Sequence, residues 1–445
     1  MTYRKVQSAR GALEQLIGAD VREGEWPLVL LFFANLFCLL AAYYILKILR
    51  EPLLLLSGGA VQQSYARGVQ AVLLALLVPV YAALANRFEP ARLVTWIMSV
   101  FALCLVVFFA FGTAGMAVGF AFFVWLGMFA TLSIAQFWSL ANDVLTEEEG
   151  KRLFPLVAGG GTIGGIAGAQ LAARTIDGHP FRLMLVAAVL LAGCAVMTHA
   201  THGVGLKHRG RKRDGPSKER DSRSGFTLVL HDPYLLLVAA SVLVLSLIST
   251  TGDFILAQLV SAKAQTLAVA ARGHFISAFY GDLQTYVSVL TAGVQILVVS
   301  RVFKAVGIGG ALLFMPLLAI SGYGASAFLP LLAVVTTVKV LENSTDHSLQ
   351  NTVRQALFLP TSRDAKYKAK AAIDTVSVRL GDLTSAGLVA LGAQLGFSMF
   401  GYAMSNAIAG LVWIWIAVQL RRRQRALCAP PRLARIGIPE LPVEG

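Results

Sequence analysis

The chain has 445 residues, of which 56% are hydrophobic and only 14% are charged, whereas soluble domains carry roughly 25% charged residues. This composition excludes an ordinary soluble domain and indicates an integral membrane protein. Apolar runs of the length that a helix needs to cross a bilayer, ~20 residues, recur along the chain without the short alternating pattern of barrel strands. The formal charge of +14 does not indicate nucleic-acid binding, because the basic residues lie mainly in loops, as a cytoplasmic bias predicts.

The N-terminal part of the chain predicts a surface segment followed by six spans. Residues 1–25 mix basic and apolar side chains with a spacing typical of an amphipathic helix lying on the membrane surface. The first span begins at Trp26 and extends to about Leu56. It is longer than a bilayer requires, so we expect a tilt or a kink, with Pro52 as the expected position of the kink. Five more apolar runs complete an N-terminal half at 26–201: 66–86, 92–112, 115–141, 153–174 and 181–200.

A second set of six spans follows a basic segment at 202–226, which we interpret as a flexible cytoplasmic linker. The C-terminal half, 227–420, holds the other apolar runs: 233–262, 275–301, 305–323, 326–349, 370–395 and 398–420. The basic tail, 421–445, and the most basic loops fall on the side of both termini, which predicts that both termini are cytoplasmic. The expected fold class is an all-α membrane protein with twelve transmembrane helices in two six-helix halves, the organisation of major facilitator transporters.

The patterns of common enzyme and metal sites are missing from the sequence. No HExxH, CxxC or GxxxxGK[ST] occurs, and the four cysteines stand singly, so we expect no enzymatic activity, metal site or cofactor. The run 159–164 has the letters of a dinucleotide-binding motif, but no strand precedes it. Glycines at 160, 164 and 168 predict instead a bare helix face that packs closely on another helix.

Charged residues inside the predicted spans are the candidate site residues, because each costs at least ~2.5 kcal/mol in the membrane and usually faces a cavity lined by protein. In the first span, Lys47, Arg50 and Glu51 stand three and four apart, so they share one face of a helix. At the start of the eleventh span, Lys370 and Asp374 stand four apart and Arg379 and Asp382 three apart, so each pair can neutralise itself. We expect the preceding Lys366 and Lys368 to reach the membrane interface.

The second half also contains acidic positions without an obvious local role. Asp253 has no basic neighbour within a helical turn, which suggests a proton-coupling group, an ion-pair partner of Lys47, Arg50 or Lys370, or a carboxylate near the outer surface. Lys339 precedes Glu342 by three residues, so these two predict a self-neutralised cluster at the membrane interface.

Several stretches resemble one known family. The run Tyr44 to Glu51 with the following Ser-Gly-Gly, the run Lys151 to Leu156 before a glycine-rich helix, and Phe279 to Asp282 resemble segments of the ATP/ADP translocases of plastids and obligate intracellular bacteria. So does the pair Phe137-Trp138 with the following Ala141-Asn142. The most specific match is the spaced series of lysines from Asp364 to Asp374. The resemblance extends from about residue 26 to 419.

This resemblance implies a major-facilitator-like fold that exchanges nucleotides across a membrane. It implies phosphate binding by basic residues of the first and eleventh helices, which fall on Arg50 and Lys370, and a seventh-helix acid, which falls near Asp253. The family's fourth-helix glutamate should fall at 124–126, where this chain has Val-Trp-Leu. Cationic groups in a low-dielectric cavity bind polyphosphate well, and a guanidinium group adds a bidentate fork.

Our leading hypothesis is a nucleotide exchanger in a bacterial cytoplasmic membrane, with the lipid bilayer and a nucleotide or other anionic small molecule as its partners. Lys47, Arg50 and Lys370 would bind phosphates, and Asp253 and Asp374 would orient these cations. Possible additional site residues are Glu51, Asn142, Asp282, Arg379 and Asp382. The alternatives are a carrier of another organic anion, possibly coupled to protons, and a membrane sensor that keeps the fold but transports nothing.

Overall fold

The computed structural model describes residues 21–22, 24–88, 90–145, 147–175, 180–209, 225–358, 361 and 369–428. Regular structure within these ranges is helical, which confirms the all-α expectation. The surface segment at 1–20, most of the linker at 202–226, Lys366, Lys368 and the tail beyond residue 428 lie outside the described residues. The expectations for these segments therefore stay predictions.

Five long helices form the N-terminal part of the chain. They are α2 (Trp26–Arg87), α3 (Pro90–Thr113), α4 (Gly119–Val144), α5 (Glu147–Thr175) and α6 (Arg182–Arg209). α2 is two helical arms, 26–58 and 60–87, joined at Gly59, whose φ of 67° and ψ of −171° are not helical. The kink expected at Pro52 is therefore wrong. Proline keeps a helix-compatible φ and the helix continues through it, whereas only glycine adopts the backbone found at residue 59 without strain.

Shorter and bent helices make up the C-terminal part. They are α7 (Gly225–His231), α8 (Pro233–Gln265), α9 (Val269–Leu297), α10 (Val299–Ala311), α11 (Phe314–Phe328), α12 (Leu332–Thr345), η1 (Asp346–Gln350), α13 (Asn351–Leu357), α14 (Lys370–Ala372), η3 (Ile373–Ser377), α15 (Val378–Gln394) and α16 (Met399–Cys428). The helices α9 and α10 meet at an angle of 72°. The segments η1 and η3 are single π-helical turns, which often occur where a helix carries functional groups.

Eight helices of the described chain are long and apolar enough to cross a membrane, or nine if the bent pair α9 and α10 counts as one span. The helix α11 is apolar but shorter. The continuous helical stretch from α12 to α13 contains Lys339, Glu342 and Asp346. These helices establish a multi-pass integral membrane protein.

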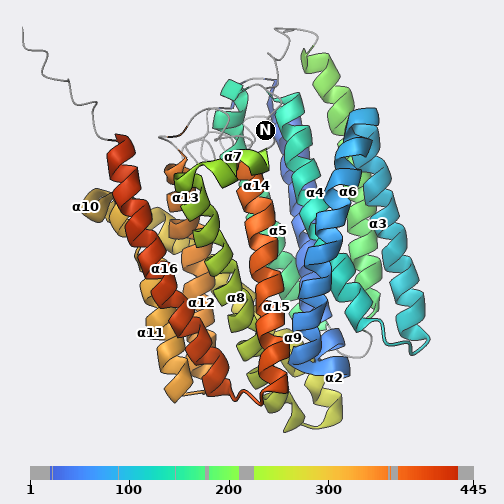
Figure 1. Cartoon of the computed structure of the whole chain (residues 1–445). Coiled ribbons are helices and arrows are strands. Elements are labelled where there is room, and N and C mark those ends of the chain that lie inside the picture. Colours follow the sequence, from blue (N-terminus) through green and yellow to red (C-terminus); the bar gives the residue numbers. More distant parts are fainter. Residues whose placement is uncertain are drawn as a thin grey trace, which may run out of the picture.

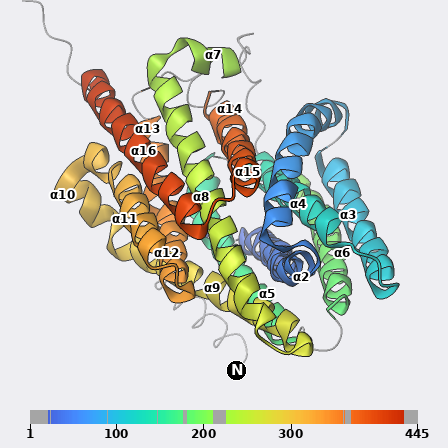
Figure 2. The same cartoon turned by 60° about the horizontal axis from the view of Figure 1, so that its bottom comes forward.

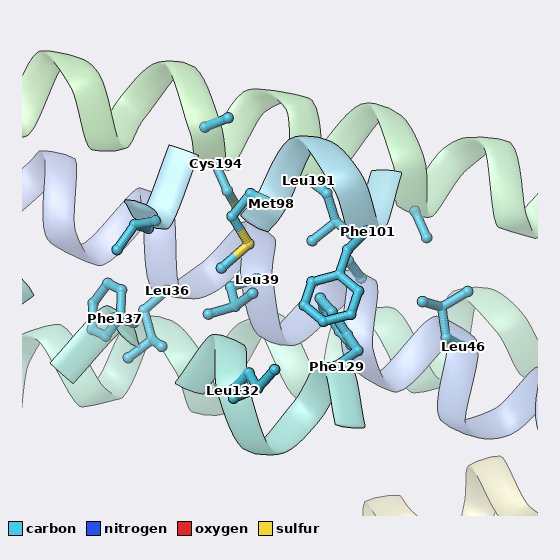
Figure 3. Packing of buried hydrophobic residues seen from close by; sticks show 14 of the residues in the cluster. Leu36, Leu39, Leu46, Met98, Phe101, Phe129, Leu132, Phe137, Leu191 and Cys194 are labelled. Atoms are coloured by element: carbon cyan, nitrogen blue, oxygen red, sulfur yellow. The ribbon is translucent and has the colours of Figure 1, made fainter. Parts of the chain in front are cut away.

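Two sets of hydrophobic cores divide the helices into two bundles (Figures 1 and 2). One core joins residues of α2 to α6, which we call the N-terminal bundle. Figure 3 shows part of this core, where Leu36 of α2 lies beside Phe137 of α4 and Phe101 of α3 lies beside Phe129 of α4. Two further cores join mainly residues of α7 to α16, the C-terminal bundle. The ends of α6 and α16 lie at the same end of the molecule, at the top of Figure 1.

The glycine repeat of α5 packs against α2. A Cβ built on Gly160 would lie 2.6 Å from the backbone oxygen of Phe33, and one built on Gly168 would lie 2.9 Å from the Cα of Ala41. Only hydrogen fits at these positions, so the two helices approach each other with backbone in contact with backbone. The prediction that these glycines serve helix packing is confirmed.

The bundles contact each other through α2 with α15 and through α5 with α9. Gly68 of α2 lies against Ala386 of α15, where an added Cβ would be 3.1 Å from the alanine methyl. On the other side of the interface, Gln170 of α5 donates a hydrogen bond to the Thr285 hydroxyl of α9 (2.6 Å). Small residues and interhelical hydrogen bonds are typical of helix contacts in membranes.

Candidate functional site

A small polar cavity of about 80 Å³ lies between the two bundles. We call it the central cavity. Both arms of α2 line it from the N-terminal bundle, and α8, α9 and α12 line it from the C-terminal bundle. The polar residues on its wall are Lys47, Arg50, Glu51, Gln63, Arg67, Asp253, Tyr280, Gln284 and Asn343.

The first arm of α2 places three charged side chains on the cavity wall, as the spacing of Lys47, Arg50 and Glu51 predicts. The Lys47 ammonium donates a hydrogen bond to Gln284 Oε1 of α9 (2.8 Å). The Arg50 guanidinium donates through Nε to Glu51 Oε1 (2.9 Å), and Gln63 donates to the other carboxylate oxygen of Glu51 (2.7 Å). The glutamate is thus held by both arms of α2, which fixes the cations beside it.

Asp253 of α8 joins the two bundles electrostatically. It forms ion pairs with Arg67 from the second arm of α2 (2.7 Å) and with Lys339 of α12 (2.9 Å). Lys339 also pairs with Glu342 (3.2 Å), and Glu342 accepts a hydrogen bond from the hydroxyl of Tyr323. One connected network therefore extends from the cavity wall into the core of the C-terminal bundle.

Two expectations about these residues are confirmed in their ion pairing and wrong in a detail. The partners of Asp253 are Arg67 and Lys339 rather than Lys47, Arg50 or Lys370. In addition, Lys339 is fully buried and Glu342 is 3% exposed, so they do not form a cluster at the membrane interface. The reason is tertiary: α12 packs against α8, which brings a second carboxylate to the lysine, and sequence spacing along one helix cannot show this.

Lys370 and Asp374 do not line the central cavity. The Lys370 ammonium donates to the side-chain oxygen of Gln355 in α13, and Asp374 lies 3.7 Å from Nε of Arg354 in the same helix. The expected pairing of Lys370 with Asp374 is therefore replaced by contacts with α13. The π-helical turn η3 begins between them, and such a turn shifts residues four apart off a common face.

Further along α15, the predicted pair of Arg379 and Asp382 is confirmed (3.1 Å). Asp382 also accepts hydrogen bonds from the hydroxyls of Ser246 and Thr250 of α8 (2.8 Å each). Arg379 donates to the Thr131 hydroxyl of α4 (3.4 Å), in the opposite bundle. This pair connects helices beside the cavity rather than lining it.

The remaining candidates lie elsewhere. Asp282 is exposed on α9 and does not line the cavity. Asn142 belongs to α4, but its side chain lies outside the described residues.

Sequence reasoning missed Gln63, Arg67, Tyr280, Gln284 and Asn343 as lining residues. The signal for Arg67 was present, because it is a lone arginine at the start of the second apolar run. An unaccompanied charge in such a run indicates a group that faces a cavity.

The fourth-helix position, where the resemblance implies a glutamate, is part of the N-terminal core. Trp125 stacks on Phe129 with ring centroids 5.6 Å apart, and Val124 and Leu126 are buried. Beside them, the Arg50 guanidinium lies 4.3 Å from the ring centroid of Phe123. An aromatic ring therefore holds Arg50 on its α4 side through a cation–π contact, without a carboxylate from the 124–126 segment.

The lining residues give the central cavity an excess of positive charge. Three lining side chains are cationic and two are anionic, while Lys339 and Glu342 behind the wall cancel each other. Among the described residues there is no group of three or more histidine, cysteine or acidic side chains that could hold a metal ion. A cavity with guanidinium, ammonium and amide donors can bind a multivalent anion by charge-assisted hydrogen bonds.

Comparisons with solved structures show the fold. A bacterial homologue of the iron transporter ferroportin, in an inward-facing state, superimposes with a TM-score of 0.67 at 12% identity, covering 89% of this chain and 100% of the other. The nucleoside transporter NupG gives a TM-score of 0.59 at 13% identity, with 91% and 99% covered. At these identities, both matches show a shared overall fold.

Comparisons with sequences point to one family. The family model described as TLC ATP/ADP transporter matches residues 285–423. ADP,ATP carrier protein 1 of Chlamydia pneumoniae is 21% identical over 348 residues, which is 67% of this chain and 65% of the relative. The protein of the same name from Chlamydia muridarum is 22% identical, with 89% of this chain and 90% of the relative covered. The matches with the C. pneumoniae and C. trachomatis proteins thus span slightly less than two thirds of those relatives, at 65% and 61%.

The family match includes the cavity-lining residue Asn343 and the buried pair of Lys339 and Glu342. Together with the sequence relatives, it confirms the resemblance that the motifs indicate. The chain is similar to the TLC ATP/ADP transporter family over residues 285–423 and, at 21–22% identity, to ADP,ATP carrier proteins over most of its length.

Proposed function

We propose that this protein is a secondary transporter that exchanges nucleotides across a bacterial cytoplasmic membrane by alternating access. The observation that supports this most directly is the central cavity, where Arg67 and Lys47 of α2 in one bundle have Asp253 of α8 and Gln284 of α9 in the other bundle as partners. In transporters of this type, the substrate site lies at the interface of two repeats that rock around it. A ligand bound between Arg67 and Asp253 would contact both moving parts.

The same proposal includes twelve spans in two halves, 26–201 and 227–420. Counting the two arms of α2 separately, the N-terminal bundle supplies six helical stretches. The C-terminal bundle supplies six more if α10 with α11, α12 with α13, and α14 with α15 each form one broken span. Both termini would then lie on the cytoplasmic side, where the basic loops fall.

Phosphate binding is assigned to Lys47, Arg50 and Arg67. Each reaches the central cavity, and each already has a partner inside the protein that a phosphate oxygen could replace or join. Arginine suits this role because its fork can bind two phosphate oxygens at once. Lys370 and Asp374 are assigned to a different state of the carrier, in which the broken helix from α14 to α15 shifts relative to α13.

Exchange of labelled ADP by purified protein in liposomes tests the proposal. We expect uptake that depends on unlabelled ATP or ADP inside the vesicles and that falls at least tenfold in Arg50→Gln. The matched control is Lys263→Gln, because Lys263 is an exposed cation of the same chain that does not line the cavity. Equal uptake by Arg50→Gln and the control would refute the assignment of the site.

Two results would favour the alternatives. Uptake that needs no internal nucleotide but responds to a proton gradient would favour a proton-coupled carrier of organic anions. Binding of nucleotide by folded protein without any flux would favour a sensor that keeps this fold.

A further inference from the structure

A second cavity adjoins the central cavity on the side of the bundle interface formed by α2, α4, α5 and α9. Its volume is about 260 Å³, and we call it the vestibule. Gln284 and Val287 of α9 line both cavities, so the two spaces meet at these side chains.

The wall of the vestibule in the N-terminal bundle consists of aromatic rings and of glycines on one helix face. Tyr44 of α2 and Trp138 of α4 present partly exposed rings. Gly161 and Gly165 of α5 lie on the same wall, and a Cβ built on Gly165 would lie 2.8 Å from the Tyr44 ring. Glycine at 165 thus lets α5 pack directly against the tyrosine ring.

The opposite wall is a polar stripe on α9. Gln284, Ser288 and Thr291 stand four and three residues apart and so lie on one face. The Gln284 amide donates to the Ser288 hydroxyl (3.3 Å). The Thr291 hydroxyl is buried and has no hydrogen-bond partner among the residues that the structure describes. Such a group costs free energy unless a ligand or water satisfies it.

The Tyr44 ring and the cations Lys47 and Arg50 follow one another along α2. Tyr44 precedes Lys47 by three residues and Arg50 by six, which places it ~4.5 and ~9 Å away along the helix axis. The Lys47 ammonium is 5.1 Å from the Tyr44 ring centroid. A ligand that has an anionic end at Lys47 and Arg50 would therefore place its other end beside Tyr44 if it lay along this helix.

We propose that the vestibule is a subsite for the heteroaromatic base of the substrate, which stacks on Tyr44 and Trp138 while Ser288 and Thr291 bind hydrogen-bonding atoms on its edge. This inference rests on the proposed function, because it assumes that the anionic end of the same molecule occupies the central cavity. Stacking is tolerant of the identity of the base, whereas hydroxyl groups on one edge can discriminate between bases.

The test compares two competitors for labelled ADP on the purified full-length chain in nanodiscs: unlabelled ADP and inorganic tripolyphosphate, which lacks a base. In Trp138→Leu, we expect competition by ADP to weaken by about 5- to 100-fold, as base–aromatic stacking energies imply. Competition by tripolyphosphate should change less than about twofold on the same reasoning. The matched control is Trp96→Leu, since Trp96 is a 62% exposed residue of α3 outside both cavities.

Thr291→Val supplies a second variant that should fold normally, because it removes a hydroxyl without a described partner and keeps the shape of the side chain. We expect it to reduce the preference for ADP over other nucleoside diphosphates and to leave competition by tripolyphosphate unchanged. If both variants bind ADP as the parent does, or lose ADP and tripolyphosphate equally, the base subsite is refuted while the anion site stands. If the parent protein binds neither compound, both proposals fail.

Discussion

Replacing Lys339 by methionine tests the buried network that connects Asp253 to the C-terminal bundle. The lysine is fully buried and holds Asp253 at 2.9 Å and Glu342 at 3.2 Å. Asp253 would keep Arg67 and is 31% exposed at its side chain, so little of the cost arises there. Glu342, 3% exposed, would keep the Tyr323 hydroxyl but no described cation.

Removing one partner of a buried ion pair costs about 3–5 kcal/mol, because the other charge stays buried and uncompensated. Methionine fills nearly the space of the lysine stem, so a cavity adds little to this cost. We expect Lys339→Met to lower the free energy of unfolding by about this amount. Thermal and denaturant unfolding of purified protein in one detergent would measure it against Lys263→Met, a change at an exposed lysine.

The double variant Lys339→Met with Glu342→Gln isolates the cause. Neutralising Glu342 removes the stranded charge and leaves an amide that can still accept the Tyr323 hydroxyl. We therefore expect the double variant to be more stable than Lys339→Met alone. Equal stability of Lys339→Met and Lys263→Met, or no recovery in the double variant, would contradict the electrostatic reasoning.

Three further variants address the bundle interface, helix packing and the phosphate fork. Arg67→Gln and Asp253→Asn should each reduce nucleotide exchange at least tenfold. The double variant should exchange nucleotides no more slowly than the less active single variant, because both changes break the same pair. Additive losses of exchange would argue against the pair. Gly168→Leu should lower the free energy of unfolding by at least 1–3 kcal/mol, roughly the cost of overpacking, because a Cβ at this position meets the backbone of Ala41. A Cβ at Gly159 meets nothing within 4 Å, so Gly159→Leu is the matched control. Similar unfolding of both variants would refute the packing. Arg50→Lys should raise the KM for ADP exchange several-fold, but less than Arg50→Gln does, because lysine keeps the positive charge and loses the bidentate guanidinium group. Equal KM values for the two variants would show that the charge at this position does not contribute to binding.

The predictions from sequence were correct where all residues of a feature belong to one helix. Lys47, Arg50 and Glu51 line the cavity together because a spacing of three and four residues is enough to place them on one face. The pair of Arg379 and Asp382 and the glycine face of α5 follow from the same kind of local rule. In each case, the helix geometry is the only structural information that the argument needs.

The site residues that depend on contacts between helices could not be predicted in this way. Asp253 and Arg67 are far apart in the sequence and belong to different bundles. Their pairing depends on how α2 and α8 pack, and many arrangements of apolar helices are compatible with the same hydropathy. A charged residue in a span could therefore be recognised as functional while its partner was assigned wrongly.

Local departures from ideal helices explain the other differences. The break in α2 is set by the backbone of Gly59 rather than by Pro52, and the π-helical turn η3 moves Asp374 away from Lys370 and toward Arg354. Both interrupt the regular helical register. A reading based on 3.6 residues per turn cannot place side chains beyond such a point.

The distribution of charge around the central cavity indicates how an anion would bind there. Arg50 and Arg67 each contact a carboxylate, Glu51 or Asp253, whereas the described hydrogen-bond partner of Lys47 is the neutral amide of Gln284. The excess positive charge of the lining residues is therefore concentrated at Lys47. An anionic group in the central cavity would therefore meet no described carboxylate partner at Lys47, whereas it would compete with Glu51 and Asp253 for the two arginines.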